Sequence, residues 1–300
     1  MCLAGEETKM SFYAAVKKNA KAVLSGRWAA GVGVTLFVLC VAASLTALEL
    51  LSLWAFAPQP SLYWRGGAVE HGYFLRVFFG HSPQELLIAG LALSAYILLL
   101  APLTLGGVRW HYVLIHGERP RFAELFYFFA GGRYGRAVWL RLQVALRCLG
   151  WGIAFLALPA GLLSICVRFL LIDALPRATR VIASVGVLVA LALLAMAAIL
   201  YAIHMGRYAL SSYLLCESDR LSVRQAISAS IRYTKGYRGV KFLFTLSYAG
   251  WYLLVPVTLL LALPFVLPYH MAGETVFARY LVERYRAEQV GVTQEFGGAA

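Results

Sequence analysis

Charge is scarce in this sequence, and acidic charge is scarcer still. Only 14% of the 300 residues are charged, with 14 Asp and Glu against 27 Lys and Arg, whereas 61% are hydrophobic. A soluble domain of this length needs a mostly polar surface, so the composition excludes a soluble globular protein. The shortage of acids also argues against a membrane-embedded enzyme, which needs converging acids, histidines or a nucleophile.

Familiar chemical motifs are missing as well. The five cysteines form no CxxC pair, which gives neither a disulfide framework nor a metal site. The sequence contains no P-loop, HExxH helix, nucleophile elbow or dinucleotide fingerprint. Glu70, His71, His81 and Glu85 match no spacing of metal ligands. We therefore predict no enzymatic activity, no cofactor and no bound metal.

The sequence is rich in long apolar runs. Four uncharged runs of 20 to 32 residues are Leu86–Leu105, Cys148–Val167, Val181–Ile203 and Phe242–Gly273. Trp28–Ala57 adds 30 residues with a single charge, Glu49. Each run can cross a hydrocarbon core of ~30 Å as a helix that rises ~1.5 Å per residue. The prediction is an all-α, polytopic helical membrane protein.

Two span counts fit the charges. The last run carries Pro256, Pro264 and Pro268, which break or kink helices, so it forms either one kinked helix or a tight hairpin. With six spans, the segments on the N-terminal side hold 5, 5, 6 and 3 Lys or Arg, and the opposite loops hold 2, 2 and 0. Five spans give 16 against 7. Both counts obey the positive-inside rule, and six obeys it better.

We therefore favour six spans, at about 28–57, 84–107, 140–172, 181–205, 240–256 and 261–280. They would form a single membrane domain over residues 1–285, followed by a flexible polar tail at 286–300. The charge bias places the N-terminus in the cytoplasm.

A basic, aromatic junction precedes three of the spans. The three junctions are SFYAAVKKNAKAVLSGRW, RFAELFYFFAGGRYGRAVW and SVRQAISASIRYTKGYRGVKF. Each is an amphipathic segment of about four turns, and such helices lie in the membrane interface with their basic side toward anionic headgroups. We expect Gly26, Gly135 and Gly236 to supply the bend into each span. The pattern favours three repeats of an interfacial helix plus a hairpin; the alternative is that every such junction needs basic and aromatic residues.

Part of the sequence resembles a known family. The residues that carry the likeness are Ser230, Lys235, Gly236, Phe244, Ser247, Gly250, Trp251, Thr258, Pro268 and Tyr269, with Pro102, Leu103, Gly106 and GERPRFAELF at 117–126 in the first half. Over residues 11–285 the chain resembles a bacterial integral-membrane family known as domain of unknown function 975. The resemblance implies a bacterial cytoplasmic membrane and no activity. One departure is Leu-Leu-Leu-Ala-Leu-Pro after Thr258, where the resemblance leads us to expect a glycine-rich turn.

Charged residues near the ends of the spans are the candidate site residues. Arg109, Arg207 and Glu274 each follow a glycine at the end of an even-numbered span and could form a charged cluster. Structural pairing is the role that we favour for these three. Arg141 and Arg147 follow the start of the third span, where they could bind a lipid phosphate or pair with Glu274. The alternative is that they snorkel to the interface, which explains Arg141 more easily than Arg147.

Glu49 is the one acid well inside an apolar run, so it either marks an ion or proton path or snorkels to the outer interface.

Two classes of function follow. The first is a non-enzymatic protein that organises lipids or binds partner proteins, with anionic headgroups of the cytoplasmic leaflet as its ligands. The second is a transporter or channel component for a small solute or a lipid. Nucleic acid is not expected as a partner, because the basic residues flank spans; any protein partner is left open.

Overall fold

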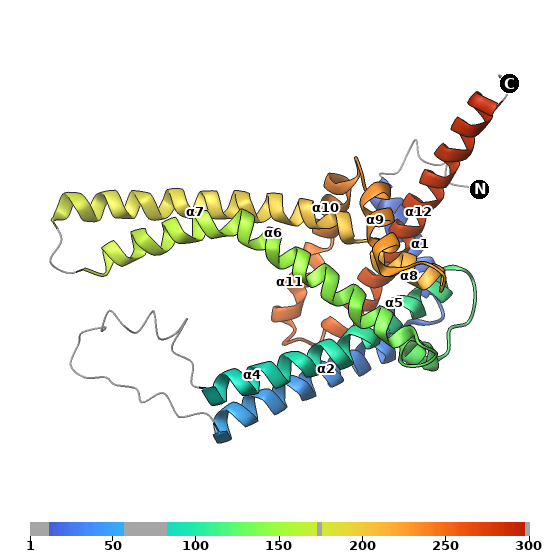
Figure 1. Cartoon of the computed structure of the whole chain (residues 1–300), viewed down its shortest axis with the longest axis horizontal. Helices are drawn as coiled ribbons and strands as arrows, with labels where there is room; N and C mark the ends of the chain where they lie inside the picture. The colour runs from blue at the N-terminus through green and yellow to red at the C-terminus, as the bar shows by residue number, and fades with distance from the viewer. Residues whose placement is uncertain (1–11, 57–82, 173–175, 298–300) are drawn as a thin grey trace.

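A computed structural model describes residues 12–56, 83–172 and 176–297, with side chains up to Gln289, and every element in this part is helical. Two long hairpins run in the same general direction away from a group of shorter helices (Figure 1). The fold is described below as three successive units. Each unit is a short helix, a turn and a hairpin.

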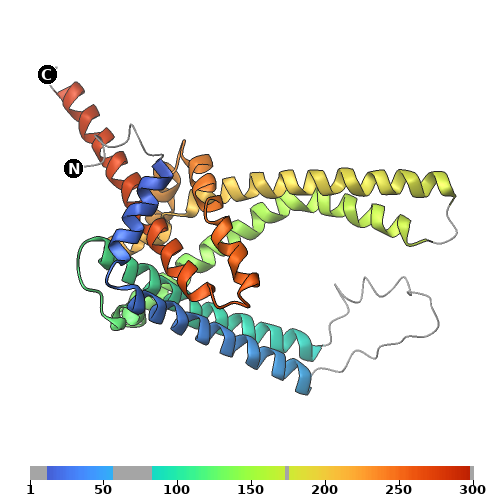
Figure 2. The same ribbon diagram turned by 180° about the vertical axis from the view of Figure 1, so that it is seen from behind.

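The first unit begins with α1 (Phe12–Leu24), whose buried residues lie one turn apart on a single face. After a turn, α2 (Trp28–Phe56) packs against a nearly continuous helix made of α4 (Pro83–Ala95), η1 (Tyr96–Leu100) and α5 (Ala101–Ile115). In Figure 2, α1 lies across the direction of the long hairpins, as an interfacial helix should.

Pro102 explains why this second helix is interrupted by the π-helical turn η1. Proline has no N–H to donate, and its ring crowds the carbonyl four residues earlier, so the regular hydrogen-bond ladder cannot continue through it. That carbonyl belongs to Leu98, and it accepts a hydrogen bond of 3.0 Å from the hydroxyl of Tyr134. The interruption therefore links the first hairpin to the second.

The second unit contains η2 (Phe122–Phe129), α6 (Arg133–Leu170) and α7 (Arg177–Met205). α6 contains Pro159 and is bent along its length (Figure 1). Two predictions are wrong here. η2 is an eight-residue 3₁₀ helix and not an amphipathic helix of four turns. The bend lies at Gly131 and Gly132, with φ of 65° and 72°, whereas Gly135 lies inside α6 with regular helical geometry.

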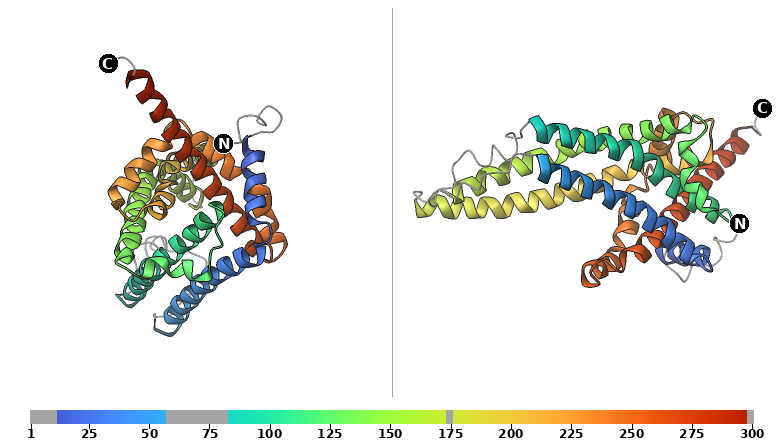
Figure 3. Two further views of the ribbon diagram at one scale, coloured as in Figure 1. Left: turned by 90° about the vertical axis from the view of Figure 1, so that its right-hand side faces the viewer. Right: turned by 90° about the horizontal axis from the view of Figure 1, so that it is seen from below.

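The third unit follows the short elements η3 (Gly206–Tyr208) and α8 (Ser211–Glu217). It consists of α9 (Val223–Tyr233), α10 (Arg238–Leu246), α11 (Ala249–Val257) and α12 (Leu263–Gly297). The bends expected at Gly26 and Gly236 are confirmed, because their φ values of 72° and 84° are accessible to glycine at low cost. In the right-hand view of Figure 3 this hairpin is set apart from the other two and diverges from them.

The tip of the third hairpin is built from leucines. Leu259 and Leu260 have φ of 48° and 71°, a left-handed conformation that costs a non-glycine residue about 1–2 kcal/mol. The hydroxyl of Thr258 accepts a hydrogen bond of 3.0 Å from the Ala262 N–H, which holds the turn closed. The chain therefore bends at the position where the family resemblance suggests glycines, although glycine is absent there.

Five of the described helices are long and apolar enough to cross a membrane: Trp28–Phe56, Pro83–Ile115, Arg133–Leu170, Arg177–Glu217 and Arg238–Val257. The sixth segment of the sequence prediction, 261–280, forms the first half of α12, which continues as a helix to Gly297. The chain is thus an all-helical, polytopic protein.

The buried core gathers at one end of the molecule. Its largest fully buried side chains include Trp110, Phe128, Phe244 and Phe277. These pack among α1, α5, η2, α8, α9, α10 and α12, whereas the far halves of the long helices expose leucine and isoleucine, as lipid-facing helices do. We call the group of α1, η2, α8, α9 and residues 269–285 of α12 the helical cap.

Candidate functional site

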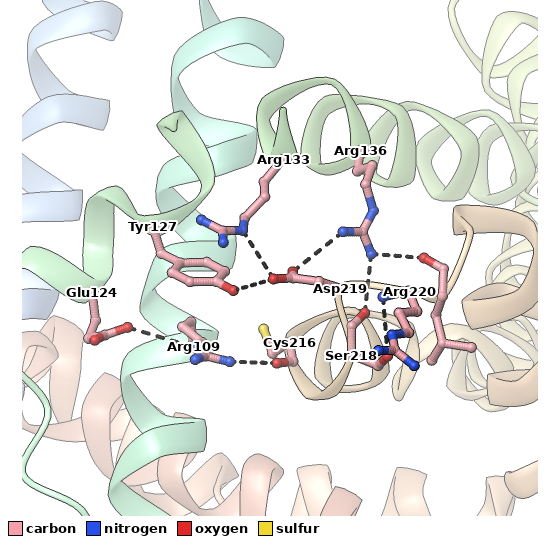
Figure 4. A network of polar contacts seen from close by, with 10 residues as sticks. Arg109, Glu124, Tyr127, Arg133, Arg136, Cys216, Ser218, Asp219 and Arg220 are labelled. Atoms are coloured by element: carbon pink, nitrogen blue, oxygen red, sulfur yellow. Dashed lines mark hydrogen bonds and ion pairs between the residues drawn. The ribbon is translucent and has the colours of Figure 1, made fainter. Parts of the chain in front are cut away.

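Asp219 is the centre of a polar network in the helical cap (Figure 4). It lies in the loop between α8 and α9. Its Oδ2 accepts hydrogen bonds from the Tyr127 hydroxyl, at 2.9 Å, and from Arg133 Nε, at 3.2 Å. Its Oδ1 accepts a weaker one from Arg136 Nη1, at 3.4 Å. One carboxylate therefore joins η2 and the start of α6 to the loop that precedes the third unit.

The charges around Asp219 set its ionisation. Burial acts to raise the pKa of Asp219, but the hydrogen bond from Tyr127 and the charges of Arg133 and Arg136 act together in the opposite direction and prevail, so the pKa lies below its ordinary value. Arg136 also donates to two backbone carbonyls of the same loop, at Ser218 (3.2 Å) and Leu221 (2.8 Å). Because 46% of the Asp219 side chain is exposed, solvent screens these ion pairs and limits their contribution to about 1 kcal/mol.

Arg109 lies beside this network but has its own partners. From α5 it donates to the Cys216 carbonyl, at 2.6 Å, and its Nε lies 3.6 Å from the Glu124 carboxylate. Its guanidinium stacks over the Tyr127 ring at 4.4 Å. Arg109 thus connects the first hairpin to η2 and α8, a structural role of the kind that the sequence analysis favours.

Glu274 is the centre of a second network, inside the third hairpin. Lys241 Nζ lies 2.5 Å from the Glu274 carboxylate, with only 11% of the lysine side chain exposed. His270, one turn earlier on α12, bonds the same carboxylate at 3.1 Å, and its other ring nitrogen bonds the Tyr252 hydroxyl at 2.7 Å. A continuous hydrogen-bond path therefore runs from Tyr252 on α11 to Lys241 on α10.

Lys17 attaches α1 to this hairpin. The helix breaks between α10 and α11, where Trp251 N–H donates to the Tyr248 carbonyl and leaves that of Ser247 available. Lys17 Nζ donates to the Ser247 carbonyl at 2.7 Å and lies 4.6 Å from the centre of the Tyr248 ring. Burial lowers the pKa of Lys17. A lysine of the interfacial helix α1 therefore satisfies the backbone carbonyl that the helix break leaves without an intrahelical partner.

Arg109, Arg207 and Glu274 do not form the charged cluster that their positions in the sequence allow. Arg207 donates to His204 Nε2 at 2.7 Å, and none of the three bonds another of them within the described part of the chain. The reason is that each lies at the end of a different hairpin and takes a partner near to it.

Arg141 and Arg147 also bond partners other than Glu274. Arg141, on α6, donates to the Thr104 hydroxyl of α5 at 3.1 Å. Arg147 bonds Gln143, one turn earlier on α6, through the side-chain oxygen at 2.7 Å. Arg141 thus bridges the first and second hairpins, and Arg147 is held along its own helix.

Glu49 lies on α2, apart from both networks and partly exposed, with no hydrogen bond or ion pair to other described residues. Glu70, His71 and His81 lie outside the described residues. Within the described ranges, no group of three or more His, Cys, Asp and Glu is placed to hold a metal ion. The sequence analysis singles out neither Asp219 nor His270, because no motif marks either residue.

One family model matches nearly the whole chain. The family model described as "Protein of unknown function (DUF975)" matches residues 10–285. The chain belongs to this family. The DUF975 match covers all three units, from just before α1 into the second half of α12. No curated protein and no solved structure matches the chain.

Proposed function

We propose that this DUF975 protein is a non-enzymatic, multi-pass protein of the bacterial cytoplasmic membrane that organises anionic lipids around its helical cap. The observation that carries the proposal is the surface of α1 and α9. Both helices bury one apolar face and contain no acid, and they expose Lys18, Arg224, Arg232 and, just after α9, Lys235. We call these four residues the basic collar.

The collar suits an anionic headgroup layer for two physical reasons. A lysine or arginine near an anionic membrane surface gains about 1 kcal/mol, and the buried faces of α1 and α9 hold these side chains at fixed positions. The surplus of basic residues at the cap end supports a cytoplasmic position for that end and for the N-terminus. Nucleic acid is not among the proposed partners, because this charge adjoins the spans.

The test compares two matched pairs of exposed arginines. Arg224→Gln/Arg232→Gln removes two of the four charges of the collar, whereas Arg177→Gln/Arg180→Gln removes the same charge from the start of α7, at the far end of its hairpin. Each protein is reconstituted with equal amounts of an anionic and a zwitterionic phospholipid of identical chains. It is then extracted in mild detergent, and the retained lipids are measured.

We expect the native protein and the α7 variant to retain anionic lipid in excess. The collar variant should lose several-fold of that enrichment, and more at low salt, where headgroup attraction is strongest. An equal loss in both variants, or no enrichment in the native protein, would contradict the proposal.

The path from Tyr252 to Lys241 supports a second candidate, a proton-coupled transporter component. Polar chains inside membrane helices commonly mark proton or ion paths. Under this alternative, Glu274→Gln abolishes proton flux into vesicles that hold a pH-sensitive dye. Glu49→Gln, which alters an acid outside the path, leaves the flux unchanged. Absence of flux in the native protein would remove the alternative.

A further inference from the structure

A cavity of about 480 Å³ opens between the α1–α2 junction and the third hairpin. That volume lies within the ~300–1,000 Å³ typical of small-molecule sites. Its lining includes Lys21, Trp28, Trp251, Leu254, Ala262 and Tyr269. Trp251 and Leu254 remain 48% and 44% exposed, so the cavity is a groove that opens sideways from the hairpin.

Aromatic rings line one side of this groove. The ring of Tyr269 lies between two tryptophans, with centroids 6.2 Å from Trp28 and 6.1 Å from Trp251. Tryptophan and tyrosine are enriched at the depth where hydrocarbon meets headgroups. The groove thus joins an aromatic belt to a purely apolar part formed by Leu254 and Ala262 near the hairpin tip.

Lys21 supplies the only positive charge of the lining. Lys17, one turn earlier on α1, is occupied by the Ser247 carbonyl. Lys21 is exposed and forms no hydrogen bond or ion pair with any residue that the structure describes. The groove therefore combines an apolar channel with one uncompensated cation next to the aromatic belt.

We propose that this groove holds one acyl chain of an anionic phospholipid from the surrounding leaflet, with the lipid phosphate on Lys21. The lining excludes a polar solute, because it would leave the polar groups of that solute unpaired. Charge complementarity selects an anionic headgroup. The inference rests on the proposed lipid-organising function and deepens it, since it adds one specific site to the general enrichment around the collar.

The test is a lipid titration followed by native mass spectrometry, with phosphatidylglycerol and phosphatidylcholine of identical chains. Lys21→Gln should weaken binding of the first phosphatidylglycerol about fivefold, the value of one basic residue at an anionic surface, and leave phosphatidylcholine unaffected. Arg177→Gln removes an exposed charge at the start of α7, outside both the groove and the basic collar; it is the matched control and should leave the first lipid unchanged. Ala262→Trp and Leu254→Trp fill the groove from two different elements, and each should weaken both lipids at least tenfold.

The outcomes separate this site from the collar. Equal effects of Lys21→Gln and Arg177→Gln, or unchanged lipid binding in both filling variants, would overturn the groove site while the collar could still enrich anionic lipid. If the filling variants lose one tightly bound lipid but the collar variant retains its lipid enrichment in the extraction experiment, the groove site stands. The proposed lipid-organising function of the collar is then contradicted. A dimer of the native protein that the filling variants dissociate would show that a second copy of the chain occupies the groove, which also overturns the lipid proposal.

Discussion

Gly106 is the position where a single methyl group should cost the most. It lies in α5 where the backbone of η2 crosses it. An added Cβ would overlap the carbonyl oxygen of Leu125 and would lie 2.6 Å from its carbonyl carbon and 2.8 Å from its Cα. Backbone atoms cannot rotate away as a side chain can, so η2 would have to move off α5.

The size of the effect follows from what η2 buries there. Leu125 is fully buried and Phe128 is 1% exposed, and both lose contacts if η2 shifts. Overpacking of this kind costs about 1–3 kcal/mol, and a clash with backbone belongs at the upper end of that range. Replacing glycine by alanine inside a helix returns up to about 1 kcal/mol. The net expectation for Gly106→Ala is a loss of about 2 kcal/mol.

The next residue provides the control. A Cβ at Gly107 would meet only the terminal methyl of Met271, at 3.4 Å, and that flexible side chain can yield. Gly107→Ala should therefore be neutral or slightly stabilising, because it keeps the gain in helix propensity. Both variants are compared with the native protein by thermal unfolding in one detergent. Equal midpoints for Gly106→Ala and Gly107→Ala would refute the close packing of η2 on α5.

Three further predictions concern the two polar networks and their surroundings. Gly273→Ala should lower the unfolding temperature, because its Cβ would overlap the Tyr248 hydroxyl; adding Tyr248→Phe should restore most of the loss, since that buried hydroxyl has no hydrogen-bond partner in the described chain. Glu274→Gln should lower the free energy of unfolding by about 2–3 kcal/mol, because it leaves Lys241 nearly buried without its counter-charge, and adding Lys241→Met should recover much of this. The depressed pKa of Asp219 means that its ion pairs stabilise the protein fully above its ordinary pKa of about 4 and lose that contribution as the pH falls further, so Asp219→Asn should reduce the loss of stability in acid.

Each of these has a result that contradicts it. If Tyr248→Phe fails to rescue Gly273→Ala, the hydroxyl is not what the new methyl group meets. If the double variant of Glu274 and Lys241 is no more stable than Glu274→Gln, the unpaired lysine is not the source of the loss. Identical acid dependence of the native protein and Asp219→Asn, followed by unfolding between pH 6 and 3, would show that the loop is not held by this carboxylate.

The spans could be predicted from the sequence because a helix that crosses a bilayer requires a continuous run of about 20 apolar residues. The bends of the first and third units could also be predicted from the sequence. Gly26 is the single glycine between the first amphipathic segment and its span, and Gly236 is the first glycine after the third segment, with Gly239 already inside α10; glycine adopts the left-handed turn at the lowest cost. In the second unit the choice among Gly131, Gly132 and Gly135 depends on backbone angles that the spacing does not reveal.

The two networks could not be predicted, because their partners are distant in the chain. Asp219 bonds residues 83 to 92 positions earlier, and Glu274 bonds a lysine 33 positions earlier. Local patterns such as a glycine beside a charge mark Arg109, Arg207 and Glu274 as similar. The packing of the hairpins decides which charged residues form ion pairs. It brings Asp219, which no sequence pattern marks, to the centre of the polar network in the cap.

The leucine turn of the third hairpin has a mechanical consequence. Leu259, Leu260 and Leu261 are 86%, 64% and 76% exposed, so moving the turn into water costs about 25 cal/mol for each Å² of apolar surface that becomes wet. Displacement in the opposite direction would move the ion pair of Lys241 and Glu274 into the hydrocarbon, which is also unfavourable. From Leu263 to Glu274 the helix rises only ~17 Å, against ~57 Å for the 38 residues of α6. The apolar turn at one end and the ion pair at the other therefore favour one depth of this short hairpin in the membrane. That depth also fixes how deep the neighbouring groove lies.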